Sequence, residues 1–229
     1  MGRPATRVDP QSFDAFAVDY DRYARLEPPM VLDWLLAQLP GRGRRALDAG
    51  CGSGRHTLAL ADRFDHVVGV DISQPLIDLA RHQRSHPRVR YMVGDLLAIP
   101  DADRFDLVLS STTLHHLPDL DAALHHLRRL VASGGTAILV DNVASRPTPP
   151  GWVYRLGAVR EFPADLRRHG SPQAWWLLKF RTSPAWLEHL TSDHYLSRHA
   201  FEQRYGAVFP GARFHALGYA HALIWHSPT

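Results

Sequence analysis

The sequence predicts an α/β protein with a doubly wound, mostly parallel seven-stranded sheet. Three observations support this fold class. Strand-like apolar runs alternate with helical patterns from residue 45 to residue 143. The first of these runs leads into a glycine-rich turn and then a helix, which is the first half of a βαβ unit. The chain then closes with two short strands around Gly218, a hairpin that adds an antiparallel strand to the sheet.

Two amphipathic helices are expected ahead of the sheet, over residues 13–40. Aromatic and apolar residues recur at helical spacing from Phe13 to Tyr23, and Pro28-Pro29 ends that pattern. A second pattern, Met30–Leu39, stops at Pro40-Gly41. The segment Met1–Arg7 has no apolar core, so it does not predict a signal peptide.

The glycine-rich stretch Arg45–Arg55 organises the chain. Ala46-Leu47 reads as the end of a buried strand, Asp48 follows at its carboxyl edge, and Gly50–Gly54 then leads into a helical pattern. Glycines allow a sharp turn and close approach of the backbone to a ligand, and the N–H groups of the helix start face that ligand. The spacing excludes a dinucleotide fingerprint, because Arg55 occupies the third glycine position, and it also excludes a P-loop.

Two more strands end in acids. His66–Asp71 is a β-branched run, and Arg88–Asp95 alternates apolar and polar residues. A carboxylate about 20 residues past a glycine loop suits a ribose diol, which is the role expected of Asp71. We expect Asp48, Asp71 and Asp95 to meet at the carboxyl edge of the sheet. A role as caps or turn residues would explain one of these acids more readily than all three.

The remaining elements follow in order. Phe105–Ser111 is the fourth strand, Leu120–Leu130 an amphipathic helix, and Thr136–Asp141 the fifth strand. Composition shifts at Ser145–Pro150, and the prolines beyond it predict short helices. The chain is therefore expected to be one domain with four parts: lid helices over 13–40, a cofactor-binding core over 45–143, a tryptophan-rich helical cap over 144–199, and a return helix and terminal hairpin over 200–229.

The motif Leu47–Gly54 and the phrase F-D-L-V-L-S-x-x-x-L-H-H-L-P-D, from Phe105 to Asp119, resemble the class I S-adenosylmethionine-dependent methyltransferases. The second phrase is similar to the type 11/12 small-molecule subgroup. The resemblance implies methyl transfer from S-adenosyl-L-methionine to a small-molecule acceptor, with oxygen favoured over nitrogen or carbon.

The resemblance also implies a set of cofactor-binding residues. The glycine loop would lie under the methionine end, Asp71 at the ribose, and Asp95 with the Leu96 N–H at the adenine. Ser110 and Ser111 would lie by the amino-acid end, and Tyr23 on a lid. The full set is Tyr23, Asp48, Gly50, Cys51, Gly52, Asp71, Ile72, Asp95, Leu96, Ser110 and Ser111.

Catalytic residues are harder to identify, because a sulfonium methyl group is already activated and transfer needs mainly alignment. A base is useful only when the acceptor arrives protonated. His115, just past the fourth strand, is the candidate base, although its L-H-H-L context also suits a structural role. A mechanism in which a cysteine thiolate attacks the acceptor is excluded, because Cys51 is the single cysteine and lies inside the cofactor loop. No metal is expected, because Ser110-Ser111 stand where a magnesium-dependent relative has an acid.

The composition of the chain disfavours several other classes of protein. Hydrophobic content of 45% and charged content of 21% are ordinary for a soluble protein, and the single cysteine favours a cytoplasmic location. No apolar run approaches the roughly 20 residues that span a bilayer. The net charge is only +3 with arginines scattered among acids, so nucleic acid is not the favoured partner. Two alternatives stay open: a binding or scaffold protein of the same fold, and a nicotinamide dehydrogenase.

Overall fold

The computed structural model describes residues 13–28 and 30–229. Pro29 and the segment Met1–Arg7, both used in the sequence predictions, therefore lie outside the described residues. The chain folds into two compact units, each formed by segments that are distant in sequence. We call them the helical unit, which joins the chain up to Leu26 with Pro147–His194, and the sheet unit, which joins Glu27–Arg146 with Tyr195–Thr229.

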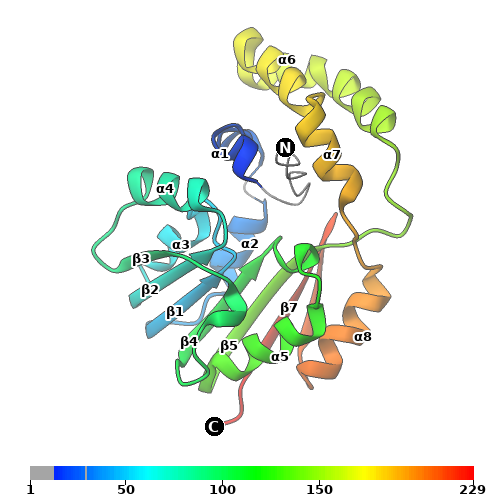
Figure 1. Ribbon diagram of the computed structural model, residues 1–229. Helices are drawn as coiled ribbons and strands as arrows, with labels where there is room; N and C mark the ends of the chain where they lie inside the picture. The colour runs from blue at the N-terminus through cyan, green and yellow to red at the C-terminus, as the bar shows by residue number, and fades with distance from the viewer. Residues whose placement is uncertain (1–12, 29) are drawn as a thin grey trace, which may run out of the picture. The chain divides into compact units, whose positions relative to one another are not determined.

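The sheet unit is built on one seven-stranded sheet (Figure 1). Its order is β3-β2-β1-β4-β5-β7-β6; the first five strands are parallel to one another, and β7 pairs antiparallel with both β5 and β6. The predicted fold class is confirmed. The strands are β1 Gly43–Ala49, β2 Phe64–Asp71, β3 Val89–Val93, β4 Phe105–Ser111, β5 Val131–Asn142, β6 Arg213–Leu217 and β7 Ala220–His226.

Helices connect these strands, and side-chain caps begin several of them. The Ser73 hydroxyl accepts the Leu76 N–H at the start of α4, and Asp119 accepts the Ala122 N–H at the start of α5. The helices of this unit are α2 Met30–Gln38, α3 Arg55–Leu60, α4 Gln74–Gln83, α5 Leu120–Leu130 and α8 Arg198–Val208, with short 3₁₀ turns η2 Leu96–Ala98 and η3 Leu114–His116.

The sheet is buried on both faces, as alternating side chains of its central strands show. Leu47 and Val108 join a cluster with residues of α5 and α8, whereas Ala46 and Leu107 join a cluster with Leu35 of α2. Both faces are apolar, which explains the near-continuous hydrophobic runs in the sequence. The helix α2 is thus part of the sheet unit's core, whereas the helix before it belongs to the helical unit.

The helical unit contains η1 Asp14–Phe16, α1 Ala17–Leu26, α6 Gly151–Arg181 and α7 Pro184–Ser192. Its interior is aromatic: Trp186 packs against Phe16, Tyr23 and Phe180. The expectation of short helices is wrong for α6, whose 31 residues are interrupted only at Gly170. Pro163 is accommodated within the first leg of α6, and Pro172 falls in the first turn after the Gly170 break, where a missing N–H costs little.

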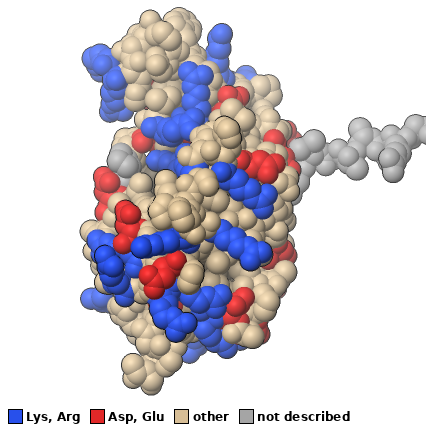
Figure 2. Space-filling view, turned by 90° about the vertical axis from the view of Figure 1, so that its left-hand side faces the viewer, with Lys and Arg blue, Asp and Glu red and all other residues tan. Residues whose placement is uncertain are grey.

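Two further features concern the length and apolarity of the helices and the charge on the surface. None of the described helices combines the length and apolarity needed to cross a membrane. On the face drawn in Figure 2, Lys and Arg side chains are interspersed with Asp and Glu.

Candidate functional site

The glycine loop follows β1 and takes a conformation that favours glycine. Gly50, Gly52 and Gly54 all have positive φ angles, of 76°, 53° and 84°. A Cβ added to Gly50 would collide with the side chain of Thr113, whose hydroxyl donates to the Gly50 carbonyl at 3.1 Å. A Cβ added to Gly52 would meet nothing within 4 Å. The loop is therefore packed on one side against the segment after β4 and open at Gly52.

The Asp71 carboxylate is held against this loop. It accepts the Gly52 N–H at 2.7 Å and the Ser73 N–H at 2.9 Å. These bonds to backbone donors fix the carboxylate at the end of β2, beside the turn that the glycines form. The contact crosses 19 residues of sequence and joins two of the predicted site residues directly.

The other two predicted carboxylates also make local hydrogen bonds. Asp48 is 1% exposed and accepts the Thr57 hydroxyl at 2.6 Å, and burial raises its pKa from 3.8 to about 7. Asp95 is exposed and accepts the Leu97 N–H at 2.9 Å, which caps η2. Each of the three acids therefore has a hydrogen bond to a residue near it. The strands that precede the acids are neighbours in the order β3-β2-β1, so their carboxyl ends lie together at one edge of the sheet.

The apolar and thiol members of the predicted set differ in exposure. Ile72 is 78% exposed directly after β2, an unusual position for a large aliphatic side chain, whereas Leu96 is buried. Burial, together with the Asp48 and Asp71 charges, raises the pKa of the Cys51 thiol well above its usual range. The predicted lid residue Tyr23 lies in the helical unit, where its ring packs on Phe180 and Trp186.

The two serines at the end of β4 are both buried. Ser110 donates to the Ala49 carbonyl at 2.8 Å and ties β4 to β1. Ser111 lies one residue further along, and its hydroxyl has no hydrogen-bond partner among the described residues. Of the pair, Ser110 has a clear structural task in the sheet.

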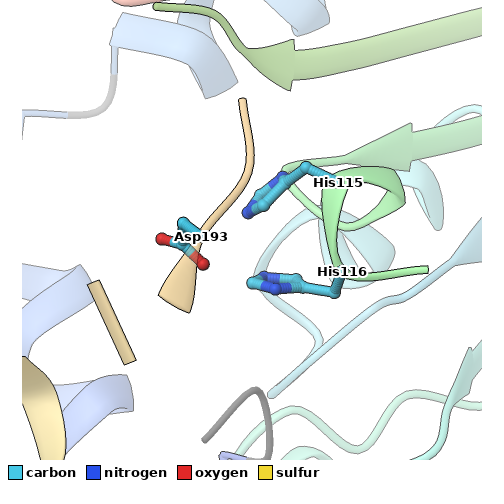
Figure 3. Close-up of side chains that lie close together, drawn as sticks. All are labelled: His115, His116 and Asp193. Carbon is cyan, nitrogen blue, oxygen red and sulfur yellow. The ribbon is translucent and has the colours of Figure 1, made fainter. Parts of the chain in front are cut away.

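A histidine–carboxylate pair, His115 and Asp141, lies where β4 and β5 end; Figure 3 shows its histidine, His115, beside His116. His115 Nδ1 is hydrogen-bonded to Asp141 Oδ1, and both side chains are nearly buried, at 6% and 4% exposure. The His116 ring packs beside that of His115, with centroids 3.9 Å apart. Because Nδ1 faces a carboxylate, the tautomer with its proton on Nδ1 is favoured, and Nε2 is then the basic nitrogen.

Asp141 is itself held by two further donors. It accepts the Asn142 N–H at 2.9 Å and the Tyr205 hydroxyl at 3.4 Å. Burial raises the pKa of the Tyr205 phenol well above its usual range, and the Asp141 charge adds to this, so Tyr205 remains a donor. The sequence did not predict Asp141 and Tyr205 as partners at this site. The available signal was that the predicted fifth strand ends at Asp141, as the second strand ends at Asp71.

Comparison with known proteins agrees with this geometry. A family model described as a methyltransferase domain matches residues 46–135. An uncharacterised methyltransferase of Mycobacterium bovis is 36% identical over 199 residues, covering 84% of this chain and 92% of the relative. A ubiquinone biosynthesis O-methyltransferase of Coxiella burnetii is 33% identical over 110 residues, 47% of each chain.

A solved structure supports the fold. The magnesium protoporphyrin IX methyltransferase of Synechocystis, with bound S-adenosylhomocysteine, has a TM-score of 0.58 and 16% identity, covering 94% of this chain and 96% of that one. The doubly wound sheet with its glycine loop and acidic strand ends thus defines an α/β cofactor-binding protein. The chain belongs to the class I S-adenosylmethionine-dependent methyltransferases, in the type 11/12 group. It is an enzyme, and S-adenosyl-L-methionine is its cofactor.

Proposed function

We propose that this methyltransferase methylates an oxygen atom of a small molecule, with His115 as the general base. The observation that carries the proposal is the buried His115–Asp141 pair at the carboxyl ends of β4 and β5. An oriented imidazole suits an acceptor that arrives protonated, such as a hydroxyl group. Nitrogen or carbon acceptors remain the alternatives.

The residues at the edge of β1 to β3 fit the cofactor. The space beside Gly52 admits close approach of a ligand to the backbone, and the Asp71 carboxylate would accept hydrogen bonds from the ribose hydroxyls. The exposed Ile72 would pack on the adenine, with Asp95 and the Leu96 N–H at its edge. When bound, S-adenosylmethionine supplies an activated methyl group for in-line displacement.

The base acts on the acceptor. His115 Nε2 would take the proton of the acceptor hydroxyl as the oxygen–carbon bond forms, and Asp141 would stabilise the resulting imidazolium. Thr113 contacts Gly50, so the segment that carries His115 is packed directly against the cofactor loop. This connection supports a base placed near the methyl donor.

We further propose that the helical unit with Tyr23 acts as the lid and cap that select the acceptor. Tyr20 and Tyr23 of this unit are half-buried where they contact the buried Trp186, and their partly exposed rings support an apolar or aromatic acceptor. The name of the Coxiella burnetii relative, an O-methyltransferase, also supports oxygen. The proposal includes a cytoplasmic location, no metal requirement and no nucleic-acid partner.

The test is the variant His115→Gln assayed against a panel of phenols, aliphatic alcohols and amines, with S-adenosylhomocysteine as the measured product. We expect kcat on a hydroxyl acceptor to fall about 100- to 10,000-fold, because a general base is lost. The Kd for S-adenosylmethionine should stay within about twofold, because His115 is not assigned to the cofactor. An exposed histidine, His125, provides the matched control His125→Gln. Unchanged kcat in His115→Gln, or equal loss in both variants, would reject the base assignment.

A further inference from the structure

The first leg of α6 carries an apolar stripe that nothing in the methyl-transfer chemistry uses. Trp152, Leu156 and Val159 are 66%, 52% and 57% exposed, which is unusual for large apolar side chains at regular spacing. The stripe continues one and two turns further on. Its members recur at intervals of four and three residues and are Trp152, Leu156, Val159, Pro163 and Leu166.

This stripe is narrow. At about 100° per residue, its five positions fall within about 80° of the helix circumference. Apolar residues at intervals of four and three positions form the contact seam between two packed helices. A helix that lies in a membrane surface has a broader apolar face. The width therefore favours another helix as the occupant over a lipid surface.

Arginines border the stripe on both sides. On the helical projection Arg155 lies about 20° beyond one margin, and Arg167 and Arg160 lie about 20° and 40° beyond the other. All three are exposed, and none forms an ion pair within the described part of the chain. They occupy positions that flank the apolar seam in helix pairs and determine the choice of partner.

The acids of this leg are placed on the other side of α6 and are already paired. Arg181 binds Asp165 at 2.7 Å and Glu161 at 2.9 Å, and Asp165 is 3% exposed. The bordered stripe thus presents only positive charge. A second copy of this chain would place arginines against arginines, which disfavours self-association.

We propose that this stripe, Trp152–Leu166 of α6, docks an amphipathic helix of a partner protein that carries acidic residues beside its apolar seam. Leu156 and Val159 would lie in the seam, and Arg155, Arg160 and Arg167 would pair with the partner's carboxylates. The stripe spans about 21 Å, the length of four helical turns, so the partner helix has about that length. This inference holds whichever acceptor the enzyme methylates.

The test uses two designed helical peptides of three heptads with leucine at the seam, one with Glu and one with Lys at the flanking positions. Binding to the full chain is measured by fluorescence anisotropy. We expect the Glu peptide to bind about 10-fold or more tightly than the Lys peptide, because three arginines each contribute a modest ion pair. The preference should shrink in high salt.

Two variants test the residues themselves. Leu156→Ser should weaken binding of the Glu peptide about 10-fold, whereas Val18→Ser, at a somewhat more exposed apolar position of α1, should leave it unchanged. The triple reversal Arg155→Glu, Arg160→Glu, Arg167→Glu should transfer the preference to the Lys peptide. A far-ultraviolet circular dichroism spectrum and an unfolding temperature like those of the wild type verify that each variant is folded.

The control reversal Arg63→Glu, Arg90→Glu changes exposed arginines of the sheet unit and should keep the preference for the Glu peptide. Three outcomes would overturn the proposal. One is equal or absent binding of the two peptides. Another is a control reversal as damaging as the triple reversal, which would mean that only net charge matters. The last is binding to anionic phospholipid vesicles, or self-association in sedimentation velocity, that Leu156→Ser abolishes while peptide binding is absent.

Discussion

The carboxyl edge of the sheet has two halves that are built differently. At β1 to β3 the groups proposed to bind the cofactor are carboxylates and backbone N–H groups of a glycine loop, and Asp71 is held by the backbone of Gly52 and Ser73. At β4 and β5 the groups are side chains held by other side chains: His115 contacts Asp141, and Asp141 contacts Tyr205.

The difference lies in how far along the chain each contact reaches. In the contacts described above, Asp71 accepts backbone donors 2 and 19 positions away, whereas Asp141, besides the adjacent Asn142 N–H, bonds to side chains 26 and 64 positions away. Backbone donors remain when a neighbouring side chain changes, so the first half suits a fixed ligand. The second half depends on three distant side chains, which suits chemistry adjusted to one acceptor.

The largest expected effect concerns the first half and pH. Below about pH 4 Asp48 is protonated in both the folded and the unfolded chain. Between about pH 4 and 7 only the unfolded chain loses this proton, because burial raises the folded-state pKa from 3.8 to about 7. The free energy of unfolding should therefore fall across this window relative to Asp48→Asn, by at most about 4 kcal/mol.

The measurement is urea unfolding of the cofactor-free protein and of Asp48→Asn at several pH values. The amide keeps an acceptor for the Thr57 hydroxyl but has no proton to lose, so it isolates the titration. Asp78, an exposed acid of α4, provides the control Asp78→Asn. Parallel pH curves for the wild type and Asp48→Asn would show that the buried carboxyl does not titrate in this window.

Much of the fold was predictable because its signals are local. Each parallel strand is a short apolar run, and Ser73 and Asp119 cap the helices that directly follow them. The length of the first leg of α6 was not predictable in the same way. Proline disfavours a helix interior, yet α6 continues through Pro163 and is interrupted only at Gly170.

The candidate site also has one part that was predictable from the sequence and one part that was not. The approach of Asp71 to the glycine loop followed from a familiar spacing, and Gly52 does donate to that carboxylate. The partner of His115 did not follow, because sequence spacing does not tell which distant acid a histidine will face. The sequence predicted Asp141 only as the end of the fifth strand, and Tyr205 only as a part of the return helix.

The next largest expected effect concerns the histidine–carboxylate pair at the ends of β4 and β5. In Asp141→Asn the amide cannot stabilise an imidazolium and no longer enforces the tautomer of His115. We expect kcat on a hydroxyl acceptor to fall about 100-fold, with the Kd for S-adenosylmethionine unchanged. Tyr205→Phe, which removes one donor to Asp141, should lower kcat by less than about 10-fold.

The double variant separates positioning from simple structural damage. If Asp141 acts only through His115, His115→Gln combined with Asp141→Asn should lower kcat no further than His115→Gln alone. Losses of kcat that add in the double variant would assign Asp141 a role independent of His115.

The smallest expected effect tests the first half again and should show the opposite kinetic pattern. Asp71→Asn keeps the shape of the side chain but removes the charge that accepts ribose hydroxyls. We expect the Kd for S-adenosylmethionine to rise about 10-fold or more, since a charge-assisted hydrogen bond contributes about 1.5–3 kcal/mol. At saturating cofactor kcat should be nearly unchanged, because Asp71 is assigned to cofactor binding rather than to proton transfer.

Calorimetry with S-adenosylmethionine gives the Kd, and Asp78→Asn again controls for a lost surface charge. A wild-type Kd would remove Asp71 from the cofactor site, and a fall in kcat equal to that of Asp141→Asn would mean that the two halves are not separate in function.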